Sequence, residues 1–78
     1  MDNKIQVKAF WDSEARVWVA ESDDVPGLVT EADTMEQLID KLHILIPELL
    51  QENEMLNVER REIPFDVYSE RKETVHCG

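Results

Sequence analysis

Carboxylates are the side chains of this 78-residue sequence with the greatest capacity for chemistry. Eighteen Asp and Glu residues outnumber eight Lys and Arg residues, which gives a formal net charge of -10. The stretch "SDDVPGLVTEADT", residues 22–34, places several of these acids between two segments that have the composition of strands. Clustered carboxylates can hold divalent cations or attract a basic partner, and the elements that position them decide between these roles.

The excess of acid is concentrated in the middle of the chain. Residues 21–54 contain ten acidic residues and one basic residue, Lys41. Such a field repels phosphate backbones and anionic lipid, and it accelerates encounter with a basic protein. We therefore expect no direct nucleic-acid binding and no membrane association. The alternative is that the charge only keeps a small domain soluble.

The acids that precede the turn at Pro26 are the first candidates for a binding role. No turn requires them, and their clustering costs mutual repulsion unless a cation lies nearby. With the following strand and the start of the helix they form one predicted partner-binding surface, made of Glu21, Asp23, Asp24, Glu31, Asp33 and Glu36. Plain solvated loop charge is the competing interpretation.

Other chemistry has weaker support in the residues. His43 and His76 are far apart in the sequence, and a metal site would need both to be brought together. Cys77 is the only cysteine, so it can close no intramolecular disulfide, and it lacks a positive setting that would activate its thiol. We expect no metal, no cofactor and no enzymatic activity.

Alternation of apolar and polar residues predicts the strands. In "KIQVKAFW" the period is two, and β-branched and aromatic residues continue in "ARVWVAES" after a short polar break. These two segments predict strands over about 3–11 and 15–22, joined as a hairpin. The segment "GLVTEA" predicts a third, shorter strand over 27–32. Phe10 and Trp18 are expected on the face of the sheet that no helix covers.

Backbone requirements explain the centre of the opening stretch. Pro26 and Gly27 fit the two central positions of a type II turn, where proline fixes the first φ and glycine tolerates a positive φ. Thr34 and Gln37 have the spacing of a capping box, in which the threonine hydroxyl accepts a hydrogen bond from the backbone N–H of Gln37. Asp33 and Glu36 place negative charge at the positive end of the helix dipole.

The apolar period changes to three and four after Thr34, which predicts a helix over 35–52. Pro47 lies inside it and removes one hydrogen bond, so a kink is expected, with a break and restart as the alternative. "QENEMLN" has no periodicity and predicts the end of the helix and a connection. A last strand is predicted over 62–71, with Pro64 at its start or on an open edge.

The predicted fold class is α+β with the order β-β-β-α-β in one domain, residues 1–78. A helix that crosses the sheet delivers the last strand parallel to the first, which predicts a four-stranded mixed sheet in the order 3-2-1-4. One bare face and two open edges predict a homo-oligomer, a dimer or higher. The absence of a signal-like or membrane-spanning segment predicts a cytoplasmic protein.

The run "RVWVAESDDVPGLVTEADTMEQLIDKL" resembles the HicB-like antitoxin family in its acidic "D-x-P-G" turn, short strand and "D-T-x-E-E/Q-L" helix start. "LIPELL" is similar to a stand-alone, uncharacterised branch related to that family, and because the sequence ends at Gly78 we expect no counterpart of the DNA-binding unit of many members. The resemblance implies a partial ribonuclease-H-like fold. It also implies an antitoxin that binds HicA, a small basic ribonuclease that cuts messenger RNA, and masks its active site.

That fold suggests a nuclease as a further alternative, because active ribonuclease-H-like enzymes hold two divalent ions between carboxylates. The nearest counterparts are Asp12, Glu36 and Asp66, but Asp12 falls at the hairpin turn and the neighbouring inner positions are apolar. Incubation with RNA and magnesium or manganese would test the nuclease alternative.

We expect a HicB-like antitoxin, with a stand-alone homo-oligomeric domain without a toxin partner as the alternative.

Overall fold

The hairpin that opens the chain is built from two strands of unequal length. In this computed structural model, which describes residues 4–54 and 62–78, β1 (Ile5–Asp12) pairs antiparallel with β2 (Val17–Glu21). The turn between them is closed by the Arg16 backbone N–H, which donates to the Asp12 carbonyl over 2.7 Å. The Asp12 carboxylate accepts hydrogen bonds from the backbone N–H groups of Glu14 and Ala15, so its role here is to hold the turn.

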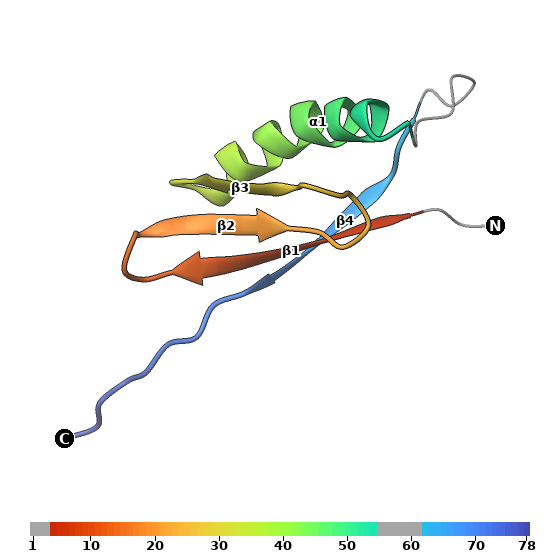
Figure 1. Ribbon diagram of the computed structural model, residues 1–78. Coiled ribbons are helices and arrows are strands. Elements are labelled where there is room, and N and C mark those ends of the chain that lie inside the picture. The colour runs from red at the N-terminus through yellow and green to blue at the C-terminus, as the bar shows by residue number, and fades with distance from the viewer. Residues whose placement is uncertain (1–3, 55–61) are drawn as a thin grey trace.

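The remaining elements complete one mixed sheet with a helix on one side (Figure 1). The order of elements is β1, β2, β3 (Val29–Ala32), α1 (Met35–Glu52) and β4 (Phe65–Glu70). The strands lie in the order β3-β2-β1-β4, with β4 parallel to β1 and the other pairs antiparallel. This arrangement confirms the predicted α+β class, element order and strand order.

The core lies between α1 and the face of the sheet that we call the inner face. Small and β-branched residues of β1 and β2, Val7, Ala9 and Ala20, are at most 2% exposed and let the helix approach closely. The helix contributes one stripe at a spacing of four, formed by Leu38, Leu42, Ile46 and Leu50. Burial of this stripe against the sheet is the main stabilising interaction of the fold.

The register of the hairpin corrects one prediction. Trp18 lies opposite Trp11 and packs against the core cluster on the inner face, with the two rings in edge contact at 5.5 Å. The prediction that Trp18 lies on the uncovered face is therefore wrong, whereas Phe10 does lie there, at 40% exposure. Opposite residues of a pair share a face, so the length of the turn, and not alternation alone, decides which face Trp18 takes.

The helix ends as predicted, and Pro47 does not divide it. α1 runs without a break from Met35 to Glu52, so the alternative of a break and restart is wrong. At the start, the Gln37 backbone N–H donates to the Thr34 hydroxyl over 3.1 Å, which confirms the cap. At the end, the Asn53 side-chain amide donates to the carbonyls of Leu49 and Pro26 and so ties the helix to the loop after β2.

The strands begin and end close to the predicted positions. β2, β3 and β4 are each shorter than predicted at one end or both, because terminal residues leave the ladder first, whereas β1 extends one residue beyond its predicted end, to Asp12. The predicted start of the first strand at residue 3 and part of the connection after the helix, from residue 55, lie outside the described residues.

Within the described residues, no helix combines the length and apolar content needed to cross a bilayer.

Candidate functional site

The loop after β2 turns the chain back over the edge of the core. Val25 and Leu28 are buried, and the Leu28 backbone N–H donates to the Val25 carbonyl over 3.1 Å across the turn. Gly27 has a φ of +86°, the left-handed value that a type II turn requires at its third position. Pro26 and Gly27 thus have the backbone role that the sequence predicts.

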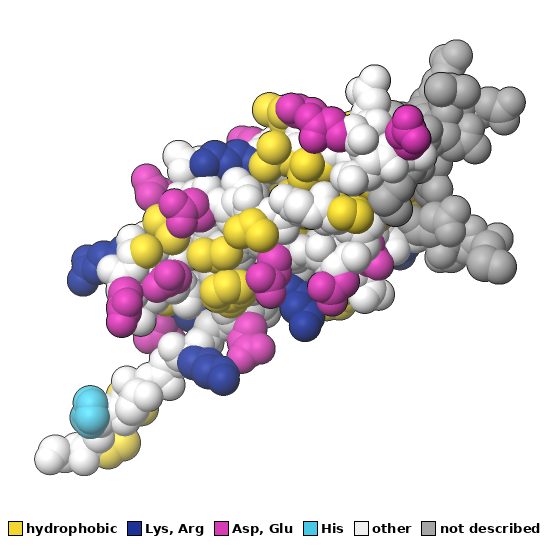
Figure 2. All heavy atoms as spheres, in the orientation of Figure 1, with side chains coloured by type: hydrophobic (Ala, Val, Ile, Leu, Met, Phe, Trp, Pro, Cys, Tyr) yellow, Lys and Arg dark blue, Asp and Glu magenta, His cyan; other side chains and the backbone are white. Residues whose placement is uncertain are grey.

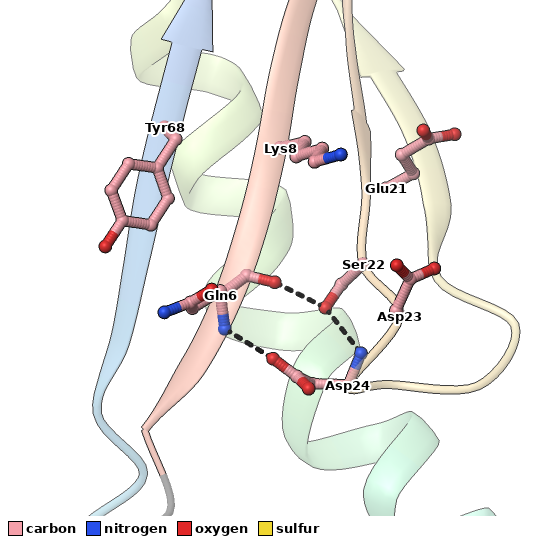
Figure 3. A pocket seen from close by; sticks show the side chains of 7 residues that line it. All are labelled: Gln6, Lys8, Glu21, Ser22, Asp23, Asp24 and Tyr68. Carbon is pink, nitrogen blue, oxygen red and sulfur yellow. Dashed lines mark hydrogen bonds between the residues drawn. The ribbon is translucent and has the colours of Figure 1, made fainter.

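The acids before this turn line one side of a hollow of about 400 Å³ on the sheet face opposite α1. We call it the acidic hollow, and Figure 3 shows its lining: Gln6, Lys8, Glu21, Ser22, Asp23, Asp24 and Tyr68. Lys8 lies between the others because the sheet register pairs it with Glu21 on one side and Tyr68 on the other. The hollow therefore combines one ammonium group, three carboxylates and a phenol.

One of the three carboxylates has a clear structural role. The Asp24 carboxylate accepts a hydrogen bond of 2.9 Å from the Gln6 backbone N–H, and the Ser22 hydroxyl donates to the Gln6 carbonyl over 2.6 Å (Figure 3). The Ser22 hydroxyl also accepts from the Asp24 backbone N–H. These bonds satisfy β1 where β2 has already ended, so Asp24 fastens the loop to the sheet. Glu21 and Asp23 are exposed.

The acidic hollow is part of a larger uncovered surface. We call it the outer face, formed by the strand residues between the buried positions: Gln6, Lys8, Phe10, Val17, Val19, Glu21, Val29, Glu31, Asp66, Tyr68 and Glu70. Three of its apolar members are exposed, Phe10 at 40%, Val29 at 70% and Tyr68 at 55%, whereas Val17 and Val19 are half-buried. Figure 2 shows acidic side chains spread over the side of the molecule that it presents, with hydrophobic ones between them.

The structure divides the six predicted partner-binding residues into two groups. Glu21, Asp23 and Asp24 line the acidic hollow, and Glu31 lies on the outer face, because its register partner Val19 points there. Asp33 and Glu36 lie elsewhere, in the connection from β3 to α1 and in the first helical turn. Four residues that line the hollow were not predicted from the sequence: Gln6, Lys8, Ser22 and Tyr68. The alternation of β1 and β4 indicates the exposure of Gln6, Lys8 and Tyr68, but only the register places them together.

The carboxylates considered for a nuclease are not brought together. Asp12 holds the hairpin turn, Asp66 forms an ion pair with Lys4 at 3.5 Å on the outer face, and Glu36 lies in the first turn of α1. Within residues 4–54 and 62–78, no group of three His, Cys, Asp or Glu side chains could hold a metal ion. His43 instead contacts the Phe65 ring edge-on at 5.3 Å, and Cys77 is exposed in the C-terminal segment.

Comparisons with known proteins support the architecture. The hypothetical protein TTHA1013 from the extremely thermophilic bacterium Thermus thermophilus, known from a crystal structure, is 47% identical. The match covers 95% of this chain and 99% of that one, with a TM-score of 0.69. No curated protein matches. The model of a domain of unknown function, DUF1902, matches residues 4–77, and the chain therefore belongs to the DUF1902 family.

Proposed function

We propose that this chain is a non-enzymatic protein-binding domain that acts as a HicB-like antitoxin. In this role it neutralises a small basic HicA-type messenger RNA ribonuclease by covering its active site. The observation that carries the proposal is the outer face, which combines exposed apolar side chains with a rim of carboxylates and has no covering element among the described residues. Exposed apolar patches with a polar rim are typical of protein-binding surfaces.

The charge of the outer face selects the class of partner. Glu21, Glu31 and Glu70 lie on it together with one central cation, Lys8. A nucleic acid would be repelled by the chain's net charge of -10, whereas a basic ribonuclease would be attracted and oriented by it. The carboxylates would take the places that RNA phosphates occupy on the toxin.

The apolar members of the outer face would supply the affinity that exposed charges do not. Surface charge mainly raises the association rate, while buried aromatic and aliphatic contacts lower the dissociation rate. Tyr68 offers ring surface beside Lys8 on β4 and Phe10 does so two residues further along β1, while Val29 lies on the edge strand β3. Contact with the toxin would be centred on these side chains, with Glu21 between Lys8 and Val29 and with Asp23 at the rim.

Asp33 and Glu36 have a smaller part in the proposal than Glu21 and Asp23. They stand at the start of α1, away from the acidic hollow, and add to the long-range field only. The role of Asp24 is chiefly structural, because its carboxylate accepts the hydrogen bond from the Gln6 backbone N–H.

The proposal is tested with the short, basic, histidine-containing protein that a neighbouring gene would encode. The expected result is that the chain inhibits RNA cleavage by this protein and that a double charge reversal, Glu21→Lys with Asp23→Lys, weakens the complex about tenfold or more. The matched control carries the same change of charge on the exposed side of α1, as Glu48→Lys with Glu52→Lys. Equal inhibition by both variants, or no inhibition by the unmodified chain, would overturn the proposal.

A stand-alone homo-oligomeric domain without a toxin is the second candidate. The observation that favours it is the outer edge of β4, which pairs with no strand in the described part of the chain and continues into an extended C-terminal segment. Static light scattering measures the oligomeric state of the chain directly, since a monomer has a mass of 9.1 kDa.

A further inference from the structure

The last strand of the sheet and the segment after it leave a long backbone edge unpaired within the described chain. β4 is the terminal strand of the order β3-β2-β1-β4, so its outer edge has no neighbouring strand among residues 4–54 and 62–78. Residues 71–78, which we call the tail, continue from β4 in extended form and project from the body (Figures 1 and 2). An open edge of this length is a template for pairing with another strand.

Hydrogen bonding identifies the backbone groups that this edge presents. The Ile5 backbone N–H donates to the Pro64 carbonyl, so residue 64 faces β1. Successive residues of a strand face opposite edges, and therefore residues 66, 68 and 70 face β1 while residues 65, 67 and 69 face outward. The same alternation carried into the tail directs residues 71, 73 and 75 outward.

We propose that β4 and the tail pair antiparallel with the same segment of a second copy of this chain. The two-fold axis passes through Arg71, so that the sheet continues across both copies. Val67 then lies opposite Val75 of the partner subunit, and Glu70 lies opposite Lys72 of the partner subunit. Asp66 lies opposite His76 of the partner subunit. Each of these pairs occurs twice, and each places complementary side chains on one face of the joined sheet.

The Glu70 and Lys72 charges favour this axis over the two adjacent ones. An axis at Glu70 would set Glu70 against its own copy, and an axis at Lys72 would do the same for Lys72, which opposes like charges directly. With the axis at Arg71, each Glu70 stands between its own Lys72, already at 3.6 Å, and the partner subunit's Lys72. Four alternating charges thus form one cluster on the outer face.

Arg71 is the one like-charge pair that the register creates, and its surroundings offset the repulsion. Its guanidinium lies 4.3 Å from the centre of the Trp11 ring and forms an ion pair with Glu73. The contact draws the charge toward the ring of its own copy. Arg71 and Lys72 offset two of the three carboxylates in residues 65–78, so two chains of net charge -10 meet at a segment whose own charge is close to neutral.

Cysteine cross-linking tests the register in the full chain with Cys77→Ser as background. In an antiparallel pair of this type, opposite Cα atoms lie about 5.5 Å apart, within the reach of a disulfide. Arg71→Cys should therefore form covalent dimers under mild oxidation. Glu70→Cys alone and Lys72→Cys alone should not, because their copies would be about 8 Å apart, but the two mixed together should. Self-linking at position 70 or 72 without linking at 71 would overturn the register.

Proline substitution tests the backbone pairing itself. The Val75 N–H faces the partner and the Thr74 N–H faces away, so Val75→Pro removes two symmetric hydrogen bonds and Thr74→Pro removes none. Val75→Pro should raise the dimer dissociation constant about tenfold or more, measured by sedimentation equilibrium, and Thr74→Pro should change it less than about threefold. Equal effects of the two variants, or a 9.1 kDa particle for the unmodified chain at micromolar concentration, would overturn the proposal.

Discussion

The inner face of the sheet presents Val7, Ala9 and Ala20, each at most 2% exposed, whereas the outer face presents Lys8, Phe10 and Glu21 from the same two strands. The first set is uniformly apolar and is covered by α1. The second set mixes apolar, acidic and basic side chains and remains open. The comparison separates two sides of one sheet: inner-face residues stabilise the fold, and outer-face residues form the exposed surface on which we propose that a partner binds.

The largest expected effect is on the inner side of this comparison. Leu42 is fully buried under the sheet, and Leu42→Ala should lower the free energy of unfolding by about 2 to 5 kcal/mol through lost burial and a residual cavity. Urea denaturation followed by circular dichroism measures this loss. Ile44→Ala, on the same helix at 65% exposure, is the matched control and should cost less than about 1 kcal/mol. Similar losses at the two positions would contradict the assigned core.

The second largest effect on stability is expected at Gly27, in the turn after β2. Gly27→Ala should lower the free energy of unfolding by about 1 to 2 kcal/mol, because φ is +86° there and a Cβ is strained in that region. Space is not the cause, since the nearest atom to an added Cβ is Leu49 Cδ2 at 3.8 Å. Gly27→Asn should recover part of the loss, because asparagine tolerates positive φ better than alanine. Thermal unfolding of the two variants distinguishes strain from crowding. If crowding were the cause, Gly27→Asn would be less stable than Gly27→Ala, because the asparagine side chain is larger.

The smallest effect separates structural from free carboxylates in the acidic hollow. Asp24→Ala removes the acceptor of the Gln6 N–H bond and should cost about 1 kcal/mol of stability. Asp23→Ala should change stability by less than about 0.5 kcal/mol, because Asp23 is exposed and surface substitutions of this kind are nearly neutral. An equal cost at both positions would show that the loop does not depend on the bond to β1.

Local signals in the sequence were sufficient for most of the fold. The cap at Thr34, the turn at Gly27 and the apolar stripe of α1 depend on residues a few positions apart, and all three were predicted. The strand order followed from the element order, because a helical crossover delivers β4 parallel to β1.

Features that depend on register or on distant residues were not predicted. The face taken by Trp18 depends on the length of the hairpin turn, and the bond from Gln6 to Asp24 joins residues 18 positions apart. The acidic hollow likewise needs three strands in register before Lys8 and Tyr68 become neighbours. Alternation indicates that such residues are exposed but not which ones meet.

The most direct test of the two-face account is an NMR titration of the ¹⁵N-labelled chain with the basic ribonuclease. The account predicts that amide shifts change at Lys8, Phe10, Glu21 and Tyr68 on the outer face. It also predicts that shifts at Asp40, Ile44 and Glu48, on the exposed side of α1, stay unchanged. Changes confined to α1, with the outer face unaffected, would contradict it.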